Sequence, residues 1–156
     1  SSRTIVRPGY PDRQADCAAA FRHAQAAIAL DPYDSRCHIS LAWNWLIARS
    51  PERATAHFRM AVDLNPNDSE TLIAAACGLA YLGKIGDARN LAAQAVQLNP
   101  IYPEYYSDYL SNIHFMAGDH AATIREVEKC RGGFPDRAVL SAAAWAHLGK
   151  SEEAAA

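Results

Sequence analysis

Three side chains in the third quarter of the sequence have the types and spacing of a nucleophile and a base. Ser107, Ser111 and His114 lie at positions i, i+4 and i+7, so on a helix they share one face, and Asp108 is adjacent. A serine beside a histidine is a pairing used in nucleophilic catalysis. On a single helix, however, spacing alone positions these groups, and no motif supplies an oxyanion hole. We therefore expect a polar strip here, and a protein that is not an enzyme.

The other histidines and the cysteines do not form a metal-binding pattern. No two histidines lie four residues apart on one expected helix, and no cysteines form a C-x-x-C pair. Nucleotide-binding and hydrolase motifs are absent. We expect no metal, no cofactor, reduced thiols and a cytoplasmic location. The residues concerned are His23, His38, His57, His120 and His147, with Cys17, Cys37, Cys77 and Cys130.

The composition favours closely packed helices and excludes two classes of partner. Alanine fills 32 of the 156 positions, against 8 glycines and 8 prolines, and alanine is the residue that costs least in a helix. The net charge is −2 and no basic stripe is visible, so we expect no nucleic-acid binding. Apolar runs are only a few residues long, so we expect no membrane contact. Carboxylates such as Glu126 and Glu128 are expected on a solvated helix face.

The elements that position these residues follow a repeat marked by prolines. Leucine, an acid or amide, and then proline recur with a period of 34 residues, at Pro32, Pro66 and Pro100, and Phe134-Pro135 follows 35 residues later. Between the marks, each block splits into two helix-length segments, because Ser50-Pro51, Gly83 and Gly118 supply starts and stops. The expected helices are residues 17–30, 35–48, 51–64, 69–82, 85–98, 103–116 and 119–130, followed by a last block over residues 138–156.

This pattern resembles the tetratricopeptide repeat (TPR) family. Leu41, Ala42 and Trp45 match the first helix of the family pattern, and Ala54, Phe58, Ala61 and Pro66 match the second in order. Later copies depart from it, with Ala92 in place of an aromatic residue and Tyr109-Leu110 in place of leucine and a small residue. The resemblance implies an all-α, right-handed superhelical solenoid of antiparallel helix pairs, with about four and a half repeats. Residues 1–14 are then an N-terminal extension or linker, and residues 15–156 are the repeat domain.

The same resemblance implies a protein–protein interaction module that holds a peptide or a helix in a concave groove. The first helix of each pair lines that groove in the family. Trp43 lies about 200° around the helix from Trp45, so the two rings face different neighbours, and we interpret Trp43 as a binding anchor. The lysine and asparagine clamp of chaperone-binding members is missing, and Glu104 and Asp108 make the groove acidic there. The expected groove residues are Arg36, Ile39, Ser40, Trp43, Leu46, Ile47, Glu70, Ile73, Cys77, Tyr81, Ser107, Asp108, Ser111, His114 and Phe115.

Two other interpretations of the sequence stay open beside the groove. The chain is a self-assembly module if copies stack through the uncovered faces of the end helices. It is an RNA-binding helical repeat if single-stranded RNA binds in a salt-dependent way. A narrower resemblance, over residues 98–106 and 117–119, is to repeat tails of bacterial signalling regulators. Those tails follow a class III nucleotide cyclase or a winged-helix head, so we expect this chain to be part of a larger regulatory protein.

Overall fold

The computed structural model describes residues 13–130 and 135–155, and it is helical throughout these ranges apart from short turns. Most helix boundaries fall within one residue of those expected from the sequence, while the first helix begins at Arg13, four residues earlier than expected. The expected N-terminal extension lies outside the described residues, except for its last two positions. The helices are α1 (Arg13–Leu30), α2 (Ser35–Ile47), α3 (Pro51–Leu64), α4 (Ser69–Tyr81), α5 (Ile85–Leu98), α6 (Glu104–Met116), α7 (His120–Lys129), α8 (Pro135–His147) and α9 (Ser151–Ala155).

Side-chain caps set where several helices begin. The Asp34 carboxylate accepts the backbone N–H of Arg36 at 2.8 Å and that of Cys37 at 3.4 Å, which starts α2 and lowers the pKa of Asp34. Asp68 caps α4 and Asp119 caps α7 in the same way, and Pro51 occupies the first position of α3. The first backbone N–H groups of a helix have no acceptor within the helix. The aspartates accept such N–H groups, and Pro51 has no N–H group that needs an acceptor.

The ends of α2, α4, α6 and α8 share one left-handed residue. Gly83, Gly118 and Gly149 have φ between 74° and 76°, and each follows the cap of its helix. After α2 the same position is Arg49, with φ of 56°. A side chain in this conformation costs energy that glycine avoids. The repeat therefore keeps its turn geometry even where its turn residue is missing.

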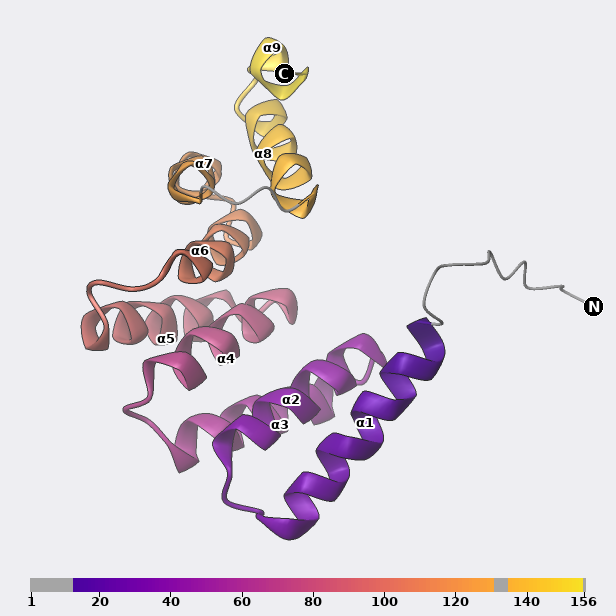
Figure 1. Cartoon of the computed structure of the whole chain (residues 1–156). Helices are drawn as coiled ribbons and strands as arrows, with labels where there is room; N and C mark the ends of the chain where they lie inside the picture. Colours follow the sequence, from indigo (N-terminus) through magenta and orange to yellow (C-terminus); the bar gives the residue numbers. More distant parts are fainter. Residues whose placement is uncertain (1–12, 131–134, 156) are drawn as a thin grey trace, which may run out of the picture.

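The helix pairs stack in chain order, from α1 at one end to α8 and α9 at the other (Figure 1). Helices α2 and α3, α4 and α5, and α6 and α7 form the closely packed pairs, and α2, α4, α6 and α8 contact one another in sequence along the stack. Over the described residues the molecule is an all-α, right-handed superhelical solenoid, as predicted, and α1 packs against α2 at one end of the stack.

Small residues and buried aromatic rings such as Phe58 make the centre of the core. Ala54, Ala61, Ala88 and Ala95 are fully buried, which confirms that these repeated small positions lie where helices approach closely. The Phe58 ring is also fully buried, between α2 and α4. Helix α4 is covered by neighbours on most sides, so nine of its thirteen residues are buried. The core is therefore centred on α4 and thins toward both ends.

The fourth proline mark differs in position from the first three. Pro32, Pro66 and Pro100 each lie two residues after the end of a helix, whereas Pro135 is the first residue of α8. Helix α7 has ten residues, against fourteen in α3 and α5, and Cys130 after it is extended. The sequence continues with Gly132 and Gly133, which are poor helix formers, and this explains the early end of α7.

None of the helices in the described ranges combines the length and the apolar character that crossing a membrane requires.

Candidate binding groove

A cavity of about 570 Å³ lies between α1, α2 and α6 and is lined by residues from all three helices. Helix α2 contributes Ile39, Ser40 and Trp43, and α6 contributes Tyr109. The remaining lining residues are Ala20, His23, Ala24, Ala27, Cys37 and Asn44. Because α4 lies between α2 and α6, two helices that are not neighbours share the walls of one cavity. The face formed by the first helices of the pairs is therefore concave here, and its volume is in the range of ligand-binding pockets.

The Trp43 side chain contributes to both the cavity and the core. It is partly exposed, and its ring meets the buried Phe58 ring edge to face at 5.6 Å and the Tyr81 ring at 6.0 Å. The Tyr81 hydroxyl in turn donates to Asn112 Oδ1 on α6 at 2.7 Å. These contacts fix the indole from beneath and leave part of it on the cavity wall.

Trp45 faces another way, as its position two residues further along α2 predicted. The Phe21 ring of α1 contacts it edge to face at 4.6 Å, and the Arg53 guanidinium of α3 lies 4.4 Å from its ring centre. Ile47, which we expected in the groove, is 60% exposed and lines a separate cavity of about 470 Å³ beside Trp45 and Phe21. Ile47 therefore does not belong with Trp43.

A second cavity of about 390 Å³ continues along α6 and α8. One end is polar, because the guanidinium of Arg137 binds the Asp108 carboxylate through two nitrogens, with Nη2 2.7 Å from Oδ2, and lies 3.8 Å from Glu104. The other end is apolar and is lined by Phe115, Val139, Leu140 and Ala143. The Arg137–Asp108 ion pair holds α8 against α6, and these two helices make few other contacts.

Ten of the fifteen residues that we predicted for the groove fall into three groups by burial. Arg36, Ile47 and Tyr81 are exposed, and Ile39, Trp43 and His114 are partly exposed. Ile73, Cys77, Ser107 and Ser111 are at most 3% exposed, so they do not contact a partner in this conformation. The two on α4 are covered because α2 and α6 flank that helix. Burial also raises the pKa of the Cys77 thiol to about 12, so Cys77 is unreactive at neutral pH.

The two serines of the polar strip are bound to other partners than the histidine. Ser107 Oγ donates to Glu126 Oε2 at 2.9 Å, and Ser111 Oγ donates to the carbonyl oxygen of Asp108 at 2.9 Å. His114 is half-buried, and burial lowers its pKa. The expectation that Glu126 is solvated was wrong: it is buried, and it also accepts Lys129 Nζ at 2.7 Å. Ser107 and Glu126 lie 19 residues apart on different helices, so their spacing in the sequence does not predict this hydrogen bond.

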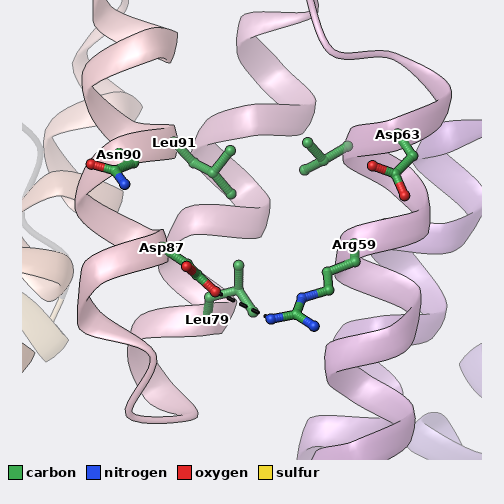
Figure 2. A pocket seen from close by; sticks show the side chains of 7 residues that line it. Arg59, Asp63, Leu79, Asp87, Asn90 and Leu91 are labelled. Carbon is green, nitrogen blue, oxygen red and sulfur yellow. Dashed lines mark hydrogen bonds and ion pairs between the residues drawn. The ribbon is translucent and has the colours of Figure 1, made fainter.

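A cavity that the sequence did not predict lies on the opposite side, between α3 and α5. It measures about 340 Å³, with Leu79 of α4 as its floor (Figure 2). Val62 and Leu91 form its apolar walls, and an Arg59–Asp87 ion pair of 3.4 Å closes one end. Both partners of that pair are more than half exposed, so its contribution to stability is small.

A pair of histidines, His38 and His57, links α2 and α3, and it too was not predicted. Their Nδ1 atoms lie 3.0 Å apart, and His38 Nε2 lies 3.0 Å from the carbonyl oxygen of Pro32. Because a carbonyl oxygen only accepts, His38 donates to it through Nε2–H, and its Nδ1 then accepts the Nδ1–H of His57. Burial, and then the charge of His38, lower the pKa of His57. The lowered pKa favours the neutral form of His57.

Comparisons with solved structures agree with this architecture. The crystal structure of MamA matches with a TM-score of 0.62 and 19% sequence identity, over 97% of this chain and 91% of MamA. A tetratricopeptide repeat protein from Parabacteroides merdae matches with a TM-score of 0.69 and 15% identity, over 92% of this chain and 57% of that protein. Pseudomonas aeruginosa PilF matches with a TM-score of 0.68 and 17% identity, over 92% of this chain and 66% of PilF. No family model and no curated protein matches the sequence.

These likenesses are at sequence identities that bear on the fold and not on the partner. The same architecture follows from this chain without the comparisons. Its evidence is the 34-residue proline spacing, the buried small residues and the alternating helix pairs. The chain therefore has the fold of a tetratricopeptide-repeat solenoid.

Proposed function

We propose that this domain is a non-catalytic protein-interaction module that binds a peptide or a helix of a partner protein in its concave groove. The observation that carries the proposal is the cavity between α1, α2 and α6, because helices that are not neighbours converge on it and a partly exposed tryptophan forms its wall. A convergent, largely apolar cavity with a few polar groups is the usual form of a recognition site.

The residues proposed for contact are those that the groove leaves accessible. Ile39, Ser40 and Trp43 line the first cavity, and Tyr81 lies beside Trp43. Asn112 and Phe115 line the second cavity further along α6. An extended segment or a helix that follows the first helices of the pairs would meet both cavities in turn. A location in the cytoplasm, and membership of a larger regulatory protein, stay predictions.

A blocking substitution on the cavity wall tests this proposal. Ser40 is exposed, lines the cavity and makes only a local bond, from its hydroxyl to the carbonyl oxygen of Arg36 at 3.0 Å. Arginine is a good helix former, so Ser40→Arg fills the cavity without weakening α2. Binders are selected from a library of short random peptides, and their affinities are measured by fluorescence anisotropy. We expect Ser40→Arg to weaken binding by about tenfold or more, or about 1.4 kcal/mol.

Ala93→Arg is the matched control. Ala93 is exposed on α5 and lines no part of the groove, so this variant adds the same side chain and charge elsewhere. We expect it to bind within about twofold of the wild type. A library that yields no binder, or binders that Ser40→Arg and Ala93→Arg affect equally, would contradict groove binding. Association of copies at high concentration, measured by light scattering and lost with substitutions at the end helices, would instead favour self-assembly.

A further inference from the structure

The groove cavity has aromatic walls on two sides. Trp43 of α2 and Tyr109 of α6 both line it, and the Tyr81 ring lies 6.0 Å from that of Trp43. The face of an aromatic ring carries negative charge density, and it attracts a cation placed within about 6 Å of its centre. Ile39 of α2, and Ala24 and Ala27 of α1, add apolar surface to the cavity. The cavity thus offers rings for a cation and apolar surface for the chain that carries it.

Carboxylates add negative charge close to Tyr109. Burial raises the pKa of Tyr109 most, and the neighbouring Cys77 and then the carboxylates of Glu70 and Asp108 raise it further. Glu70 is exposed and accepts the hydroxyl groups of Tyr105 and Tyr106, which are neutral donors. Among the described residues Glu70 forms no ion pair, so its charge is not cancelled. Tyr105 precedes Tyr109 by one turn of α6, so the Glu70 carboxylate lies beside the α6 wall of the cavity without lining it.

The positive groups nearby do not offset this field. The Arg137 guanidinium is bound to Asp108 and lies near Glu104. Arg36 is exposed one turn before Ser40 and does not line the cavity. His23 is the one titratable base on the wall, and it comes from α1, opposite Tyr109. Glu70 is therefore the carboxylate near Tyr109 whose negative charge no positive group of the described residues balances.

From this arrangement we infer that the cavity binds an arginine side chain of the partner segment, with its guanidinium group between Trp43 and Tyr109 and in the field of Glu70. A planar guanidinium stacks on aromatic rings better than a lysine ammonium does, and it remains charged at any physiological pH. The aliphatic stem of the arginine packs against Ile39 and the alanines of α1. This inference rests on the proposed function, and it names the side chain that anchors the partner.

A small probe tests the site without a partner peptide. The indole N–H signals of Trp43, Trp45 and Trp145 are followed by NMR while N-acetylarginine amide is added to the domain. N-acetylcitrulline amide, which has nearly the same shape without the charge, is the matched probe. We expect the arginine probe to shift the Trp43 signal in a saturable way and to bind at least about fivefold tighter than the citrulline probe. Trp45 and Trp145 lie outside the cavity, so their signals stay in place.

Substitutions distinguish this site from nonspecific attraction. Glu70→Gln removes the charge but keeps an acceptor for the two tyrosines, and we expect it to weaken the arginine probe about threefold. Tyr109→Leu should weaken it about fivefold, whereas Tyr33→Leu, at an exposed tyrosine outside the cavity, should have no effect. Equal binding of the two probes, or equal effects of Tyr109→Leu and Tyr33→Leu, would overturn the inference.

The two proposals can fail separately. If Ser40→Arg abolishes peptide binding while the arginine and citrulline probes bind alike, the groove binds peptides without an arginine anchor. If the arginine probe shifts Trp43 but Ser40→Arg leaves peptide binding intact, peptides bind elsewhere and the cation site serves another ligand. An unmoved Trp43 signal up to the solubility limit of the probe overturns the arginine site whatever the peptides do.

Discussion

Gly78 in α4 lies directly against the end of the Phe58 ring, and this contact permits a quantitative test of the packing. A Cβ atom added at Gly78 would lie 2.0 Å from Cζ, 2.3 Å from Cε2 and 2.6 Å from Cε1 of Phe58. Carbon atoms in contact are about 3.5 Å apart or more, so the ring or the helix must move by about 1.5 Å. The ring is fully buried and has the Trp43 ring on another side, so it has little room to move.

The net effect of Gly78→Ala follows from two opposing contributions to the free energy of unfolding. Alanine is better than glycine inside a helix by about 1 kcal/mol. Overpacking a filled core costs about 1–3 kcal/mol, and a displacement of this size belongs at or above the upper end. We expect a net loss of about 2 kcal/mol. For a chain of this length that lowers the Tm by about 4–8 °C.

The assay is thermal and urea unfolding followed by circular dichroism, with two reference variants. Gly86→Ala places a methyl group on α5 where no atom lies within 4 Å, so we expect it to be neutral or stabilising by up to about 1 kcal/mol. Phe58→Leu removes the three ring atoms that clash. In that background, Gly78→Ala should change sign and stabilise the domain by about 1 kcal/mol.

The change of sign between the two backgrounds distinguishes a clash with the Phe58 ring from other causes of destabilisation. If Gly78→Ala stabilises the wild-type domain as much as Gly86→Ala does, the Phe58 ring does not lie against α4 as described. If Gly78→Ala destabilises both backgrounds equally, the clash is with something other than the ring. Either result would also weaken the placement of Trp43, because Phe58 supports it from beneath.

Three further measurements test separate parts of the molecule. Arg49→Gly should stabilise the domain by about 1 kcal/mol, measured by urea unfolding, because glycine relieves the left-handed conformation that ends α2; no gain would show that this turn is not strained. Because its pKa is lowered on folding, His57 contributes stability that is present above pH 6.5 and is lost as the pH falls through the lowered value. The Tm should therefore be lower at pH 5 than at pH 7, and His57→Gln should reduce that difference; an unchanged difference would remove His57 as its cause. Asp108→Asn should weaken the bond to Arg137 and cost about 1–3 kcal/mol; hydrogen exchange should rise first in α8, and uniform exchange would contradict a local role.

The sequence predicted the repeat and the boundaries of its helices closely, because both depend on local signals. Proline, glycine and capping residues act within one turn of chain, and they recur with the period. The fourth mark has a different place in the repeat, since Pro135 begins a helix where the earlier prolines follow one. A proline is compatible with both positions, and only the early end of α7 decides between them.

The candidate site was less predictable, because it depends on how helices cover one another. Helical periodicity assigns Ile73 and Cys77 to the same face as Tyr81, but it does not say that α2 and α6 cover that face near the centre of the stack. Of these three residues, only Tyr81, at the end of α4, remains exposed. Tyr109 was recognised as a departure from the repeat pattern and not as a wall of the groove. Its place beside α1 and α2 follows from the curvature of the whole solenoid, which no local pattern encodes.

The width of the cavity between α2 and α6 depends on the curvature of the solenoid. Its walls belong to helices on either side of α4, so bending the stack at α4 opens or narrows the space between them. A solenoid bends by small rotations between neighbouring repeats. A partner side chain bound as proposed between those walls would hold them at a fixed separation. Occupancy of this one cavity would then affect the curvature of the solenoid, and with it the distance between the two ends.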